Sequence, residues 1–422
     1  MIDRFGMAHA TDCPAALAAF ADATEGLAAY QRDMMQALDR ALVADSGMVA
    51  AHALKGLLLV VASRAETLST AHEVWRGMPA EPVTSDEIAL CAALREGLSR
   101  GLLAAAAALD AHLARRPDLL LFVKLSTMLR FVGGDAAGMR RTTERVLPAW
   151  RPALPGFGYV LGCHAFALEE TGAYAAAERA GRDAVAIAPH DAWAVHAVAH
   201  VHEMTGRADD GIAWIESLRP DWRGCNSFAF HLSWHLCLFH LERGEHGRVL
   251  DLYDAEVRPD CSEDTRDYSN AVSMLWRLRQ HGVAVGDRWD ELATIARRRR
   301  HEATLVFAAL HRLLALLAVG DCGAVRDVVS AIEAAGTGEQ AAVATDFGAR
   351  LARALCADAD VPLVGLADRL APLGGSHAQR DVFARALALL ARRSDSPTAL
   401  AEVLAARRSV RVDDRFLDLL TA

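Results

Sequence analysis

A glycine recurs at a nearly constant step through the middle of the chain. Gly172 follows Glu-Thr, Gly206 follows Met-Thr 34 residues later, and Gly244 follows Glu-Arg after a further 38 residues. Each glycine separates two stretches of roughly 12 to 18 residues whose apolar positions recur at the helical period. A turn glycine between paired helical segments predicts a stack of helix pairs, in which each pair buries its apolar face against the next.

The spacing and the small residues indicate the type of repeat. A step of 34 residues is that of tetratricopeptide repeats. Counted from Gly172, the repeat positions for an aromatic residue, two small packing residues and a terminator are occupied by Tyr174, Ala177, Ala184 and Pro189. We therefore predict an all-α fold, a tetratricopeptide-like α-solenoid of antiparallel helix pairs.

The repeat pattern divides the chain into three predicted parts. Residues 119–262 hold the tetratricopeptide-like repeats, including a copy whose first helix ends at Gly134. Residues 1–118 and 263–422 keep the helical rhythm and lose the small-residue pattern. We expect degenerate helical pairs in the N-terminal part, and helical repeats with a cap in the C-terminal part, because the exposed ends of a repeat stack must be covered.

Charge and composition argue against two classes of partner. The net charge of -9 disfavours binding to nucleic acid, which needs a surplus of lysine and arginine on one face. No stretch reaches the roughly 18 to 20 apolar residues that a membrane span requires. The eight cysteines are spread along the chain without a Cys-x2-Cys pair, a pattern typical of reduced, buried thiols, and it predicts a cytoplasmic location.

Several segments resemble the tetratricopeptide repeat protein 38 family. They are residues 191–204, 231–235, 242–245, 252–254, 273–278, 286–289 and 307–311. The resemblance extends from about Leu119 to Gly320, and it implies a repeat fold more than a settled activity. Where we expect that family to carry a His-Asp pair, this chain has Thr127 and Met128. The resemblance therefore implies an altered site if that pair helps to build one.

Histidines concentrate in the repeat region, where nine of the 17 lie between His164 and His246. Residues at positions i, i+4 and i+7 share one face of a helix, so His196, His200 and Glu203 form a stripe. Trp193 lies one turn before this stripe. By the same count the neighbouring repeats direct further side chains inward. The preceding repeat contributes Tyr159, Gly162, Phe166 and Glu169 or Glu170, and the following one contributes His231, Trp234, Leu238 and Glu242, with His235 flanking them.

These stripes predict a concave pocket that binds a small molecule. The candidate metal ligands are His196, His200 and His231, because imidazole suits zinc and iron. The candidate catalytic residues are Glu203 and His235, as acid–base groups. An enzyme with this pocket would use metal-dependent or His/Glu-dependent chemistry. The other predicted pocket residues are Tyr159, Phe166, Glu170, Trp193 and Trp234.

Three alternatives stay open at this point. A metal-free arrangement, in which the imidazoles bond to one another, to Glu203 or to the backbone, fits the same pattern. Repeat proteins commonly bind peptides or proteins in their groove, which predicts a scaffold without catalysis. The apolar segments Asp381–Leu390 and Arg415–Leu420 also permit a homodimer.

Overall fold

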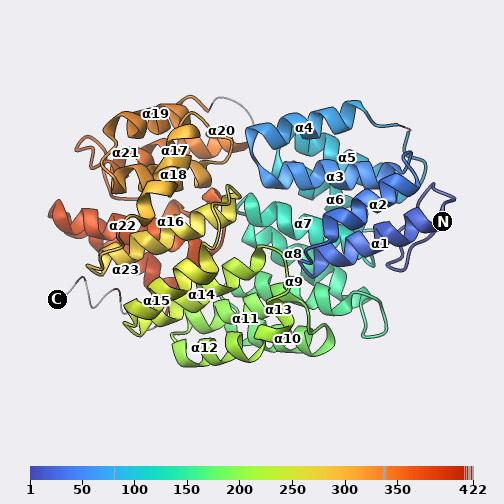
Figure 1. The fold of residues 1–422 in the computed structure, drawn as a ribbon, viewed down its shortest axis with the longest axis horizontal. Helices are drawn as coiled ribbons and strands as arrows, with labels where there is room; N and C mark the ends of the chain where they lie inside the picture. The colour runs from blue at the N-terminus through green and yellow to red at the C-terminus, as the bar shows by residue number, and fades with distance from the viewer. Residues whose placement is uncertain (80, 336–338, 413, 415, 417–419, 421–422) are drawn as a thin grey trace. The chain divides into compact units, whose positions relative to one another are not determined.

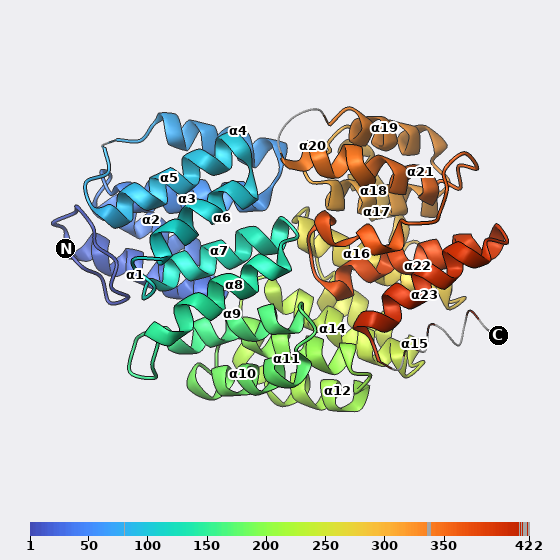
Figure 2. The same ribbon diagram turned by 180° about the vertical axis from the view of Figure 1, so that it is seen from behind.

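The computed structural model describes residues 1–79, 81–335, 339–412, 414, 416 and 420. These residues form helices α1 to α23 and no strand, apart from two isolated bridges, Ile2–Ala8 and Gln31–Cys225 (Figures 1 and 2). In the part of the chain so described, no helix combines the length and the hydropathy needed to cross a bilayer. Two segments are candidates for self-association. In the second of them, residues 415–420, positions 415 and 417–419 lie outside the described residues. The all-α prediction is confirmed.

The chain divides into two compact units, the first made of residues 1–201 and 217–229 and the second of residues 202–216 and 230–422. Three helices contribute residues to both units: α11 (Ala192–Met204), α12 (Ala208–Ser217) and α14 (Phe228–Glu242).

The remaining helices of the first unit are α1 (Pro14–Ala28), α2 (Met34–Ala44), α3 (Val49–Ala62), α4 (Ala65–Arg76), α5 (Ser85–Arg100), α6 (Leu102–Leu113), α7 (Leu120–Val132), α8 (Ala136–Val146), α9 (Phe157–Glu169), α10 (Tyr174–Ile187) and α13 (Arg219–Trp222). Those of the second unit are α15 (His246–Leu252), α16 (Thr265–Gln280), α17 (Arg288–Arg298), α18 (Val306–Ala318), α19 (Cys322–Glu333), α20 (Glu339–Val343), α21 (Ala349–Leu355), α22 (His377–Arg393) and α23 (Pro397–Val410). Each unit buries its own apolar interior, around side chains such as Phe20, Leu94 and Phe122 in the first and Leu275, Leu313 and Phe383 in the second.

The repeating glycines make the turns inside the helix pairs. Gly172 connects α9 to α10 with φ of 80°, Gly206 connects α11 to α12 with φ of 70°, and Gly244 connects α14 to α15 with φ of 73°. Residues with a Cβ atom disfavour this left-handed conformation, which explains the choice of glycine. The helices α9 and α10 lie side by side in both views (Figures 1 and 2). The predicted tetratricopeptide-like helix pairs are confirmed.

Two glycine substitutions should have opposite effects on stability. No atom lies within 4 Å of a Cβ built on Gly172, so Gly172→Ala is strained only through its backbone and should cost about 1–2 kcal/mol of unfolding free energy. Gly247, on the exposed side of α15, also has open space and lacks a positive φ. Gly247→Ala should therefore stabilise the chain by about 0.5–1 kcal/mol. Urea unfolding followed by circular dichroism measures both, and equal effects would contradict the assignment of the turn.

Small residues allow α9, α10 and α11 to approach one another closely. The buried face of α10 consists of Ala177, Gly181, Ala184 and Val185, at helical spacing. A Cβ on Gly181 would lie 2.5 Å from a methyl carbon of Val198 in α11. A Cβ on Gly162 in α9 would lie 3.2 Å from the Cβ of Ala194 in α11, so α9 and α11 also approach closely enough for their facing side chains to make contact.

Helix α11 is buried on every side, since each of its residues from 192 to 204 is buried. It nevertheless carries His196, His200, His202 and Glu203. Burying polar groups costs free energy unless they interact with partners, so a wholly buried helix with these side chains must be matched by polar groups on its neighbours. Those partners define the candidate site.

Candidate functional site

The first unit brings together the predicted residues of α9 and α11. The ring of Phe166 lies 4.6 Å from that of Trp193, 5.2 Å from that of His196 and 5.3 Å from that of His200, measured between centroids. Trp193 also contacts His196, at 4.9 Å. The facing stripes predicted from helical spacing therefore meet in an aromatic and imidazole cluster, and all four side chains are buried.

Two carboxylates lie beside His200 in this cluster. Nδ1 of His200 is 3.5 Å from Oε2 of Glu169 and 4.0 Å from Oε1 of Glu170. Each residue offers one ligand atom, these atoms lie within 4.8 Å of one another, and all three residues are buried. A separation of 3.5 Å is long for a hydrogen bond but close to the roughly 3.3 Å edge of a tetrahedron whose ligands lie about 2.0 Å from zinc.

Tyr30 and Lys124 border the same cluster. Tyr30 stacks on Phe228 at 4.3 Å and on Trp193 at 5.7 Å, and its φ of 57° lies in the left-handed region. Nζ of Lys124 in α7 is 4.4 Å from the centre of the Tyr30 ring. Burial by itself lowers the pKa of Lys124, but Tyr30, Cys163 and Asp191 offset this and leave the pKa raised. The sequence offers no local pattern that points to Tyr30.

Asp191, which directly precedes α11, is buried between this helix and α9. Its Oδ1 accepts a hydrogen bond from the backbone N–H of Trp193 at 3.1 Å. A Cβ on Gly162 would lie 2.3 Å from its Oδ2, so only glycine leaves room there for the carboxyl group. Burial raises the pKa of Asp191 to about 7, against the lowering effect of Lys124 and the backbone N–H groups.

Two further residues singled out in the sequence, Tyr159 and Thr127, pack within the first unit. Tyr159 is half-buried in α9 against the apolar core of the first unit, and burial raises the pKa of its phenol. Thr127 is the first of the two residues that stand where the resembling family is expected to have a His-Asp pair. Its hydroxyl donates to the backbone carbonyl of Val123 at 3.0 Å and lies 3.7 Å from the sulfur of Cys163. Both side chains thus take part in packing within the first unit.

In the second unit, His235 is held by a carboxylate. Its Nδ1 donates to Oε2 of Glu203 at 3.1 Å, which places a proton on Nδ1. Arg411 donates to Oε1 of Glu203 at 3.2 Å and to Glu242 at 2.9 Å. Glu203 and His235, the predicted catalytic residues, are therefore joined, and Arg411 is a partner that the sequence did not predict.

His231 and Trp234 complete this part of the second unit. The His231 ring stacks on Trp234 at 5.4 Å and meets His235 edge to face at 4.8 Å. The guanidinium carbon of Arg277 lies 5.6 Å from the centre of the Trp234 ring. Nδ1 of His231 is 2.8 Å from the side-chain nitrogen of Asn270 in α16, a second partner that was not predicted.

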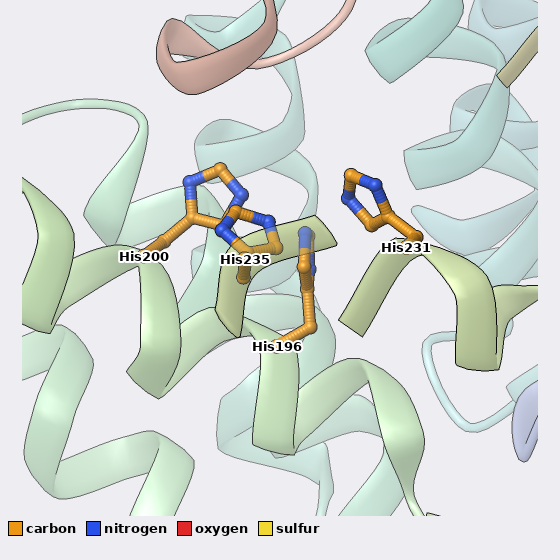
Figure 3. A group of neighbouring side chains, drawn as sticks. All are labelled: His196, His200, His231 and His235. Atoms are coloured by element: carbon orange, nitrogen blue, oxygen red, sulfur yellow. The ribbon is translucent and has the colours of Figure 1, made fainter. Parts of the chain in front are cut away.

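Figure 3 draws the four central histidines with the two helices that carry them. His196 and His200 are one turn apart on α11, and His231 and His235 are one turn apart on α14. All four are buried, and each offers a ring nitrogen that can bind a metal.

A cavity of about 400 Å³ lies elsewhere in the second unit. Its lining includes Trp276, Arg279, Gln280, Leu317 and Cys356, and none of the residues predicted for the site.

No family model matches the chain. Among solved structures, it is similar to a monomeric mutant of IFIT1 with Gppp-AAAA, at 11% identity and a TM-score of 0.39, over 92% of this chain and 99% of the other. It is similar to yeast Tom70 at 12% identity and a TM-score of 0.33, over 96% and 94%. The tetratricopeptide-repeat domain of P58(IPK) aligns at 14% identity and a TM-score of 0.22, over 82% and 90%.

Proposed function

We propose that the chain binds a divalent metal ion, zinc or iron, together with a small molecule. The observation that carries this proposal is the buried group of Glu169, Glu170 and His200, whose ligand atoms lie within 4.8 Å of one another. Carboxylate oxygen and imidazole nitrogen are the donors that zinc and non-haem iron share in enzymes. His196 is the next proposed ligand, because its ring lies 4.3 Å from that of His200 on the same helix.

The proposed chemistry follows from this donor set. A metal held by two carboxylates and one or two imidazoles keeps coordination positions for water or for a substrate oxygen, which the ion would polarise. Phe166 and Trp193 offer flat faces for an organic ligand. Glu203 and His235 are the proposed acid–base pair. That these groups all face one bound molecule, as the sequence predicts, stays a prediction.

We further propose that the chain is a member of the tetratricopeptide repeat protein 38 family. The segments that support this assignment, residues 191–204 and 231–235, are also those that carry the buried histidines. A protein-binding scaffold without a metal is the alternative, and the test below distinguishes the two.

Elemental analysis of untagged protein, purified without chelators, tests the metal site directly. The wild type should contain close to one zinc or iron per chain. His200→Ala should weaken metal binding by about tenfold or more and thereby lower the metal content, because even the loss of a residue that only supports a ligand weakens metal affinity by about 10–100-fold. His72→Ala is the matched control, since His72 is exposed on α4 of the same unit and should leave the content unchanged.

Further variants assign the ligands one at a time. Glu169→Gln and Glu170→Gln keep the size of each side chain and remove its charge, so each should weaken metal binding. His231→Ala tests the sequence-based prediction that His231 is also a ligand. A wild type that stays metal-free after incubation with zinc and iron would overturn the proposal. A stoichiometric protein partner in that case would support the scaffold.

A further inference from the structure

A chain of hydrogen bonds in the second unit determines which nitrogen of His231 carries its proton. The chain begins at the N-terminus of α22, where the backbone N–H of Ser376 donates to Oε1 of Gln379 at 3.1 Å. The hydroxyl of Ser376 accepts from the backbone N–H of Gln379 at 3.2 Å, which completes a capping box. A backbone N–H can only donate, so the side-chain amide of Gln379 has a single possible orientation.

The orientation of the Gln379 amide determines the orientation of the Asn270 amide. Since Oε1 of Gln379 is directed at Ser376, its Nε2 donates to Oδ1 of Asn270, at 3.3 Å. Nδ2 of Asn270 then faces Nδ1 of His231 at 2.8 Å. Turning the Asn270 amide over would place two amide nitrogens against each other, both of them donors. Ser376, Gln379, Asn270 and His231 are all buried, so water does not compete for these bonds.

The consequence is a fixed tautomer of His231. An amide nitrogen only donates, so Nδ1 of His231 must accept and carry no proton. The neutral ring therefore has its proton on Nε2 and presents an N–H group there. His235, one turn later, differs at this atom, because its Nδ1 carries a proton and donates to the carboxylate of Glu203. The two ring centres are 4.8 Å apart.

We infer that Asn270 and Gln379 are positioning residues that hold His231 in the tautomer with its proton on Nε2. A histidine that binds a metal gives one ring nitrogen to the ion and donates a hydrogen bond from the other. In His231 the Asn270 amide donates to Nδ1 and the proton lies on Nε2, so this tautomer assigns His231 to the role of a hydrogen-bond donor instead of metal binding. This assignment does not depend on the proposed function.

Nitrogen-15 NMR of the full chain, labelled at histidine, reads the tautomer of each ring. At neutral pH, His231 should show its proton on Nε2 and His235 on Nδ1, with His231→Gln identifying the first signal. His311 is an internal reference, because its Nδ1 donates to the backbone carbonyl of Phe307 at 2.8 Å, and burial lowers its pKa to about 3 and keeps it neutral.

Two variants should reverse the tautomer of His231 by different routes. Asn270→Asp presents a carboxylate that accepts from Nδ1, so the proton should move there. Gln379→Glu leaves no donor facing Asn270, so the Asn270 amide should turn over and accept from Nδ1 of His231. Asn226→Asp adds the same charge in the first unit, where Oδ1 accepts from the backbone of Phe228, and should leave His231 unchanged.

A wild-type His231 that carries its proton on Nδ1, or on both nitrogens, would overturn the inference without any variant. An Nδ1 of His231 that stays unprotonated in folded Asn270→Asp protein would overturn it as well. Metal content is measured separately, so a metal-free protein with the expected tautomer would remove the proposed metal site and retain the assignment of His231.

Discussion

Replacing Arg411 by alanine is expected to lower the free energy of unfolding by about 3–5 kcal/mol, the range for breaking a buried ion pair from one side. The Arg411 side chain is 6% exposed and contacts two carboxylates, those of Glu203 and Glu242. Burial alone lowers the pKa of Arg411, but Glu242 and Glu203 reverse this and raise it above its usual range. The alanine variant would leave the buried carboxylate of Glu203 and the partly buried carboxylate of Glu242 without this cation.

Two control variants separate the ion pair from the loss of a side chain in general. Arg408→Ala, on the exposed side of α23, should change the unfolding free energy by less than about 0.5 kcal/mol. Arg411→Lys keeps the charge but lacks the planar fork that bonds two carboxylates at once, so its loss should be intermediate. Urea unfolding at neutral pH measures all three, and an Arg411→Ala variant as stable as Arg408→Ala would contradict the expected result.

Arg411 also connects the C-terminal segment to the candidate site. The backbone N–H of Val412 donates to the carbonyl of Met204, at the end of α11, at 2.8 Å. Arg411 holds one oxygen of Glu203, and the other oxygen accepts from His235. Arg411 therefore helps to keep Glu203 an acceptor, and through it the proton on Nδ1 of His235.

The fold was predictable because its signals are local. The 34-residue step from Gly172 to Gly206 marks equivalent turns, and each glycine has the positive φ that explains its place. The pairing of Phe166 with His196 follows from the same local periodicity, applied to two consecutive first helices. Such signals need only the residues of one helix pair and its neighbour.

The partners of the site could not be predicted, because they come from distant parts of the sequence. Arg411 contacts Glu203 from 208 residues further along the chain, and Tyr30, between α1 and α2, stacks on Trp193. Asn270 follows His231 by only 39 residues, but its amide is oriented by Gln379, a further 109 residues along. Helical spacing identifies which face carries His231. It cannot show whether that ring meets a metal or an amide, because the answer depends on Gln379 at the start of another helix.

The same limit applies to the predicted pocket lining. Trp193 and Phe166 face inward as the spacing indicates, but the interior beside them holds Tyr30 and Phe228. Periodicity predicts which residues are inside and contains no information on how that interior is filled. In the first unit the predicted aromatic residues therefore contact protein side chains.

Asp191 should make the stability of the chain fall as the pH rises from about 4 to about 7. Its carboxyl is fully buried, and burial raises its pKa to about 7 from the usual 3.8. Between these two values the folded chain keeps a proton that the unfolded chain releases, so a rising pH favours the unfolded state. A shift of about three units corresponds to roughly 4 kcal/mol, reached near pH 7 and constant above it.

Asp191→Asn removes this titration and keeps an oxygen that can accept from the Trp193 backbone. The variant should match the wild type near pH 4 and exceed its unfolding free energy by an amount that grows towards pH 7, because the amide carries no charge to bury. Urea unfolding at half-unit intervals of pH measures the difference. Asp183→Asn, on the exposed face of α10, is the matched control and should follow the wild-type profile. Parallel profiles for wild type and Asp191→Asn would show that this carboxyl is already ionised in the folded chain at pH 4, and that Lys124 and the start of α11 hold it in that form.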